Sequence, residues 1–208
     1  MVLAVENGKR SQVLVRRVLQ KVNKILDGRI PRLITSDEFK AYKTEILRLY
    51  GISVTVGRKG RRGRFPKDRL IPPSDLLYAT VHKTRENGRV VCVEERLQFG
   101  TQESLDRALL VSNRSSSVNT SFLERYNGTD RGQNRRKVRK SYCFSKDWDV
   151  HNSMTKFVMY SYNFCWCVWT LRLEISPGVF RQRTPAMAAG LSDHVWSMRE
   201  WITYPVIM

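Results

Sequence analysis

The sequence has few acidic residues for its size, and this shortage excludes a charge-balanced protein. Among its 208 residues, 19 are Asp or Glu and 37 are Lys or Arg, so the formal net charge is +18. A charge of this size favours a polyanionic partner, most often nucleic acid. The alternative is a basic protein that has no such partner.

Cysteine, histidine and long apolar runs are also scarce. Four cysteines are too few for a disulfide framework, and Cys165 and Cys167 lack the second pair of a zinc site, so we expect buried, reduced thiols. The three histidines show no zinc-ligand spacing and are expected to be structural or surface residues. The longest apolar stretch, 157–171, is too short to span a membrane. With no signal peptide visible, these features predict a cytoplasmic protein.

The first half of the chain alternates apolar runs with amphipathic segments. Strands are expected at 1–5, 32–35 and 52–56, and helices at 11–27 and 38–50. This order predicts a largely parallel α/β sheet with helices on its faces.

A basic loop, 57–69, interrupts the alternation. Asn87 and Gly88 then predict the turn of a β-hairpin, because both residues tolerate the positive φ that a tight turn requires. Beyond residue 100 the pattern is mainly helical. The expected segments are 78–82 and 89–93 for the hairpin, and 101–112, 119–140, 147–171 and 193–202 for the helices.

Asp37 is the first candidate for chemistry, because it comes directly after an expected strand of a parallel sheet. Active sites gather at the carboxyl ends of such strands. An aspartate before a helix is also a common N-cap, and the pattern leaves both interpretations open.

Glu124 is the second candidate. Glu124, Gly128, Arg131 and Arg135 share one face of an expected helix. This pattern suits a divalent cation held beside a phosphodiester, with arginines on neighbouring phosphates. The alternative is a solvated helix with ordinary charge pairs. Further cations expected to contact phosphates are Arg58, Lys59, Arg61, Arg62 and Arg64 in the basic loop, unless that loop is only solvated, and Arg136 and Arg139.

Tryptophan is concentrated in the C-terminal half. All five tryptophans lie between Trp148 and Trp201. Such side chains pack in cores or stack on nucleic-acid bases, and core packing is the expectation here.

Short motifs are spread along the chain from Gly8–Arg10 to Trp196. They include Thr35–Tyr42, Val118–Asn127, Phe144–Lys146, Tyr162–Phe164 and Arg183–Leu191. In their order and spacing these motifs resemble the bacterial insertion-sequence transposases of the DDE class.

This resemblance implies an RNase H-like mixed sheet flanked by helices, in which three carboxylates hold two Mg2+ or Mn2+ ions. It implies that Asp37 and Glu124 are the second aspartate and the glutamate of that set, both catalytic and metal-binding. Arg131 would contact transposon-end DNA. The implied activity is Mg-dependent cleavage and transfer of DNA strands in transposition, on double-stranded transposon ends and target DNA in the bacterial nucleoid.

The sequence departs from the family at its start. The family's first catalytic aspartate precedes the segment matched by Gly8–Arg10, and no aspartate precedes Asp27 here. We therefore expect a partial catalytic domain over 1–208 that lacks its first strand, with an α/β part at 1–100 and a helical part at 101–208. Two metal ions need about three carboxylates, so impaired activity is expected. The alternative is a non-catalytic DNA-binding remnant that associates with itself or with an intact transposase.

Overall fold

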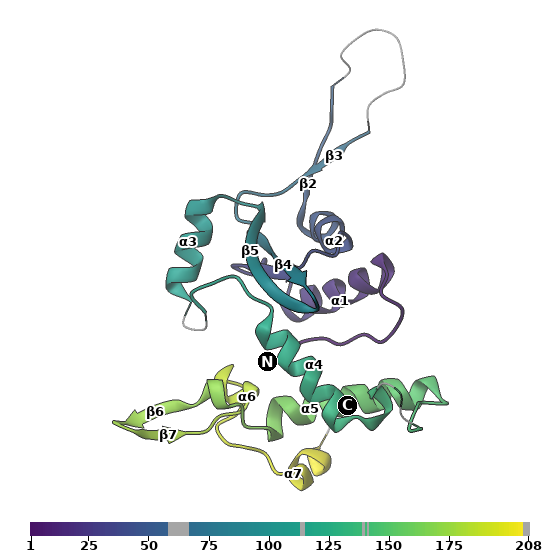
Figure 1. The fold of residues 1–208 in the computed structure, drawn as a ribbon, viewed down its shortest axis with the longest axis vertical. Helices are drawn as coiled ribbons and strands as arrows, with labels where there is room; N and C mark the ends of the chain where they lie inside the picture. The colour runs from purple at the N-terminus through teal and green to yellow at the C-terminus, as the bar shows by residue number, and fades with distance from the viewer. Residues whose placement is uncertain (58–66, 113–114, 139, 141, 206–208) are drawn as a thin grey trace. The chain divides into compact units, whose positions relative to one another are not determined.

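The chain forms two compact units in the computed structural model. We call residues 8–124 the sheet unit, and residues 125–208 together with 1–7 the helical unit. Figure 1 shows their elements, a mixture of helices and small sheets that confirms the α/β class. The residues that the structure describes are 1–57, 67–112, 115–138, 140 and 142–205.

The sheet unit is built on three strands in the order β1-β4-β5. β1 pairs in parallel with β4, and β4 pairs antiparallel with β5. Among the described strands only β1 and β4 are parallel, so the expectation of a largely parallel sheet is wrong. The elements of this unit are α1 (Gln12–Ile25), β1 (Ile34–Asp37), α2 (Ala41–Tyr50), β2 (Ile52–Val54), β3 (Arg69–Ile71), β4 (Tyr78–Glu86), β5 (Arg89–Phe99), α3 (Gln102–Val111) and the start of α4 (Ser121–Gln133).

Hydrophobic side chains pack on both faces of this sheet, because alternate residues of β4 point to opposite sides. Tyr78 packs with Ile46 of α2 on one face. Ala79 and Val81 pack with Leu105 of α3 on the other. In Figure 1, α3 accordingly lies across the sheet from α1 and α2.

The hairpin between β4 and β5 confirms the turn predicted at Asn87 and Gly88, whose φ angles are 48° and 79°. The strand predicted at 52–56 does not join the sheet. Its residues in β2 pair antiparallel with β3, so that Ile52 faces Ile71. All residues of β2 and β3 are exposed, as expected for a ribbon that covers no core.

A buried carboxylate joins α1 to α2. The Glu45 side chain is 1% exposed, and it accepts hydrogen bonds from Gln12 Nε2 at 2.6 Å and from Arg16 Nε at 2.8 Å. The hydrogen bond from Arg16 holds the pKa of Glu45 below its usual value. A charged carboxylate is tolerated in such a place because its charge is paired and its oxygens are bonded.

The helical unit is organised around α5, whose inward face is buried at Val158, Met159 and Tyr162. The Tyr162 ring contacts the ring of Tyr126 in α4, with the centroids 5.0 Å apart. The elements of this unit are α4 from Arg125 onward, the 3-10 turn η1 (Arg135–Lys137), α5 (Trp148–Cys165), the 3-10 turn η2 (Trp169–Leu171), β6 (Leu173–Ser176), β7 (Val179–Arg181), α6 (Pro185–Ala188) and α7 (Met198–Thr203).

The chain beyond residue 100 is mainly helical, as predicted, and β6 and β7 add a short antiparallel hairpin that was not predicted. The strand predicted at 1–5 is wrong, because these residues form no strand. Instead, the Val2 backbone N–H donates to the Asn163 side chain at 2.9 Å, and the Val2 carbonyl accepts from it at 2.8 Å. A polar side chain of α5 therefore satisfies the backbone groups that a neighbouring strand would have bonded.

The apolar stretch 157–171 is divided between the end of α5 and η2. Within the described ranges, no helix has both the length and the apolar character needed to cross a bilayer. Cys165 and Cys167 in this stretch are free thiols, but they are only half-buried, contrary to the expectation of full burial.

Candidate functional site

Asp37 is the last residue of β1, and its side chain is 56% exposed. Its carboxylate binds Arg10, with Arg10 Nη2 and Asp37 Oδ2 2.7 Å apart. The backbone N–H of Phe39 donates to the other oxygen at 3.3 Å. Because α2 begins only at Ala41, Asp37 bonds the turn that leads into the helix and is not its N-cap.

Glu124 lies in the first turn of α4, and its side chain is 58% exposed. Glu124 Oε1 is 2.5 Å from Lys83 Nζ in β4 and accepts a hydrogen bond from Thr120 Oγ1 at 3.0 Å. The hydrogen bond from Lys83, followed by that from Thr120, lowers the pKa of Glu124. The carboxylate is therefore held in its charged form by the sheet unit.

The two carboxylates lie near the same end of the β1–β4 pair. The register places Asp37 opposite Val81, and Lys83, which binds Glu124, is two residues further along β4. Thr35 of β1 also donates to the Asn119 carbonyl at 3.5 Å, which brings the segment before α4 to the same strand. Each candidate carboxylate is thus ion-paired with a cation of this chain, Asp37 with Arg10 and Glu124 with Lys83.

The described residues do not by themselves form the ligand set that the resemblance implies. Two Mg2+ or Mn2+ ions need about three carboxylates. Among the described residues, no group of three or more His, Cys, Asp or Glu side chains is arranged to hold a metal ion. Arg10 and Lys83 supply the positive charge at Asp37 and Glu124 instead.

A further group of charges, which the sequence did not reveal, lies beside Asp37. Glu38 Oε2 is 2.5 Å from His82 Nδ1, and Glu38 Oε1 is 2.8 Å from Arg96 Nη1. The hydrogen bond from His82 lowers the pKa of Glu38. A cavity of about 450 Å3 opens at Glu38 and is lined in part by Lys40. Only the register of β1, β4 and β5 could have brought these residues together, because their separations in the sequence follow no motif.

Arginines without carboxylate partners in the described part of the chain lie along α4 and in η1. Arg125, Arg131, Arg135 and Arg136 are exposed, and in the described part of the chain none of them forms an ion pair. We call these four residues the arginine surface. A guanidinium group is always charged and presents planar donors that match a phosphate, so this surface suits a polyanion.

Local bonding leaves these arginines free. Glu124, which precedes Arg125, is paired with Lys83. Asp130, which precedes Arg131, is 10% exposed and already forms a 2.6 Å ion pair with Lys137, which is 14% exposed. The buried Asn134 side chain accepts from the backbone N–H of Arg136 at 3.2 Å and starts η1. This bond competes with the helix, so α4 ends at Gln133 and the helix predicted over 119–140 is too long.

Of the cations predicted to contact phosphates, the structure describes Arg131, Arg135 and Arg136. Arg131 remains on the same helix as Glu124, but Arg135 lies in η1, so the single helical face predicted for them is wrong. Arg136 is exposed in η1 as well. The cations that lie outside the described residues are Arg58, Lys59, Arg61, Arg62, Arg64 and Arg139.

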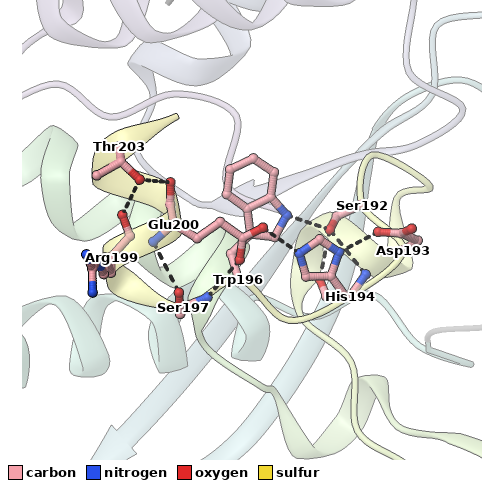
Figure 2. Close-up of polar contacts among 8 residues, drawn as sticks. All are labelled: Ser192, Asp193, His194, Trp196, Ser197, Arg199, Glu200 and Thr203. Carbon is pink, nitrogen blue, oxygen red and sulfur yellow. Dashed lines mark hydrogen bonds and ion pairs between the residues drawn. The ribbon is translucent and has the colours of Figure 1, made fainter. Parts of the chain in front are cut away.

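A charged network surrounds His194 in the helical unit (Figure 2). His194 Nδ1 is 2.5 Å from Asp193 Oδ1, and Nε2 is 2.8 Å from Glu200 Oε1. Only the imidazolium form has a proton on each nitrogen. The hydrogen bonds to Asp193 and then Glu200 accordingly raise the pKa of His194. Ser197 and Glu200 also form a capping box at the start of α7, so the network holds the loop that leads into this helix.

Comparisons of this chain with protein families, with curated proteins and with solved structures find no match. The likeness to DDE-class transposases therefore rests on the sequence motifs, and the function it implies is a proposal. The contacts within each unit indicate whether the described residues support DNA binding, strand cleavage or both.

Proposed function

We propose that the chain binds double-stranded DNA and takes part in DNA transposition as a protein of the DDE transposase class with an RNase H-like sheet. The observation that carries the proposal is the arginine surface, where four exposed arginines have no carboxylate partner among the described residues. Contacts to phosphates supply most of the sequence-independent affinity for DNA.

Two further features support this proposal. The net charge of the chain, +18, is larger than the charge of the four arginines, so other cations of the chain also attract DNA. The buried pair of Asp130 and Lys137 fixes the backbone from which Arg131, Arg135 and Arg136 project. A phosphate backbone therefore meets cations whose positions are set in advance.

The test is the salt dependence of duplex binding. Fluorescence anisotropy with a labelled DNA duplex compares the full chain with the triple variant Arg131→Gln, Arg135→Gln and Arg136→Gln. Each lost phosphate contact lowers the slope of log K against log salt by about 0.9, so we expect a reduction of about 3.

The matched control removes the same charge from arginines that are already ion-paired. It is the triple variant Arg48→Gln, Arg96→Gln and Arg107→Gln. We expect a clearly smaller change in slope for this variant. Equal changes in both variants would show that only net charge matters, and absence of duplex binding at low salt would reject the proposal.

A second candidate function is Mg-dependent cleavage and transfer of DNA strands. The observation that favours it is the placement of Asp37 and Glu124 near one end of the β1–β4 pair. A strand-transfer assay on transposon-end DNA with Mg2+ or Mn2+ compares Asp37→Asn and Glu124→Gln with the controls Asp106→Asn and Glu103→Gln on α3. Activity that survives the first two substitutions would contradict their assignment.

The assay has a second arm in which an intact transposase is added. A non-catalytic protein that associates with such an enzyme would change strand transfer in this arm, and the effect would survive substitution of Asp37 and Glu124. This outcome would favour a modulating role over catalysis.

A further inference from the structure

Two exposed aromatic rings and an arginine meet beside the β6–β7 hairpin. The guanidinium carbon of Arg172 lies 4.0 Å from the ring centroid of Trp169 and 3.9 Å from that of Phe180. Trp169 is nevertheless 64% exposed and Phe180 is 41% exposed. We call these three residues the ring cluster. The expectation that the tryptophans pack in the core fails at Trp169.

The ring cluster is held in place by two hydrogen bonds at the open end of the hairpin, where β6 begins and β7 ends. Arg183 Nε donates to the Leu171 carbonyl at 2.8 Å, which fixes η2 beside Arg172. Arg181 Nη2 donates to the Asp193 carbonyl at 2.9 Å, and Asp193 belongs to the His194 network of Figure 2. Rings that are ordered before a ligand arrives bind it with a smaller loss of entropy.

We propose that the ring cluster stacks against the unpaired bases of single-stranded DNA. Every base has a π-face that an exposed aromatic ring can cover, and such stacking tolerates any sequence. Arg172 touches one side of each ring, and the large exposed fractions show that both rings still offer surface to a ligand. Its guanidinium group also provides donors for the phosphate that links two bases.

The charge of the hairpin argues for nucleic acid and against a protein partner. The segment 166–183 contains three arginines and one glutamate. That residue, Glu174, accepts a hydrogen bond from the Gly178 N–H at 3.0 Å and so belongs to the turn. The register pairs Glu174 with Phe180, which places Phe180 and Arg172 on one face. Ile175, which is 61% exposed and lies at the register shift of this hairpin, serves below as a control.

This inference goes beyond the proposed function. Bases in a duplex are stacked on one another and offer no free face, so the arginine surface and the ring cluster would take different forms of DNA. Each can therefore fail without the other.

The test measures the anisotropy of a labelled oligothymidylate and of a labelled duplex with the full chain. We expect the double variant Trp169→Ala and Phe180→Ala to weaken oligothymidylate binding about tenfold or more, because base–aromatic stacking contributes about 1–3 kcal/mol per base. Binding of the duplex should not change. The substitution Trp169→Phe, which keeps an aromatic ring, should retain most of the affinity for the single strand.

Three controls keep the result specific. Trp148→Ala removes a tryptophan that is 58% exposed but stacks on His151, and Ile175→Ala removes an exposed apolar side chain of the same hairpin that is not part of the ring cluster. Both variants should bind the single strand normally. Arg172→Lys keeps the charge but loses the planar group, so an intermediate affinity is expected.

Thermal unfolding of each variant, followed by circular dichroism, shows whether the fold is kept. Unchanged oligothymidylate binding by the folded double variant would overturn the proposal. So would an equal loss for the duplex, because the cluster would then act only through general DNA affinity. A change from dimer to monomer in sedimentation, without a change in single-strand binding, would identify a surface for self-association instead.

Discussion

The two units differ in how they use their positive charges. In the sheet unit, Arg16 binds a buried carboxylate, and Arg10 and Lys83 bind the two candidate catalytic carboxylates. In the helical unit, the arginine surface and Arg172 have no carboxylate partner within the described residues. A cation that is already paired gains less from an added phosphate, so the arginine surface and Arg172 are better placed to contact DNA than Arg10, Arg16 and Lys83 are.

Among the described residues, each unit also contains one buried carboxylate, and the surroundings of the two differ. Asp130 in the helical unit and its partner Lys137 are both largely buried. Glu45 in the sheet unit is buried, but its partners Arg16 and Arg48 are 38% and 55% exposed. Removal of Asp130 therefore leaves the largely buried Lys137 without its partner. Removal of Glu45 leaves Arg16 and Arg48, which water can solvate.

The largest effect is expected for Asp130→Ala. Lys137 would keep its buried position without a partner, and breaking such a pair costs about 3 kcal/mol or more. Urea unfolding followed by tryptophan fluorescence measures this effect in the helical unit, because all five tryptophans lie within residues 125–208. The double variant Asp130→Ala with Lys137→Met removes both charges and should recover most of the loss. If it is as unstable as the single variant, the pair is not the cause.

A smaller loss, about 2 kcal/mol, is expected for Glu45→Ala, since charged hydrogen bonds contribute about 1.5–3 kcal/mol and the released arginines reach water. Far-UV circular dichroism follows this change in the sheet unit, where fluorescence is silent for lack of tryptophan. Glu103→Ala on α3, which loses an exposed pair with Arg107, should change stability by less than about 0.5 kcal/mol. Equal losses at positions 45 and 103 would mean that burial of Glu45 does not matter.

Local signals made several elements of the fold predictable from the sequence. A helix is predicted to begin at Ser11, and the Ser11 hydroxyl accepts from the Leu14 N–H at 3.3 Å and caps α1. Asn87 and Gly88 were expected to form a turn, and both have positive φ. These features depend on residues close together in the chain, and local chemistry is sufficient to determine them.

The failures have a different origin. Residues 1–5 look like a strand, but their bonding is decided by Asn163, 161 residues after Val2. The ring cluster was missed because whether a tryptophan is buried depends on what packs over it. Asp37 and Glu124 were singled out from the sequence, but the cations that bind them were not, because Lys83 of β4 is 41 residues away from Glu124 of α4 and meets it only in the folded chain.

The pairing of Glu124 can itself be tested by Lys83→Met. Loss of the Lys83 hydrogen bond should raise the pKa of Glu124, as measured by carbon-13 NMR of the side-chain carboxyl groups. Thr120→Val removes the weaker contribution and should give a smaller rise. Both partners are partly exposed, so stability should change by less than about 1 kcal/mol. Arg107→Met serves as a reference that should leave the pKa of Glu124 unchanged. If the pKa of Glu124 were also unchanged in Lys83→Met, Lys83 would not be paired with Glu124, and the contrast between paired cations in the sheet unit and unpaired arginines in the helical unit would fail at this site.

The smallest effect is expected in the pH dependence of the helical unit, where two histidines act in opposite directions. The pKa of His194 is raised above 6.5 by its bonds to Asp193 and Glu200. Its contribution to stability is therefore complete below pH 6.5 and is lost as the pH rises through the higher folded value. The pKa of His151 is lowered from 6.5, chiefly by burial, so its contribution is complete above pH 6.5 and is lost as the pH falls through the lower folded value.

Thermal unfolding by tryptophan fluorescence across this range separates the two groups. His194→Gln should flatten the fall in melting temperature above pH 6.5 and leave the acid side unchanged. His151→Gln should flatten the acid side alone. If His194→Gln instead altered only the acid side, the carboxylates of Asp193 and Glu200 in Figure 2 would not hold the imidazolium form of His194, and the opposite pH dependences expected for the two histidines would be contradicted.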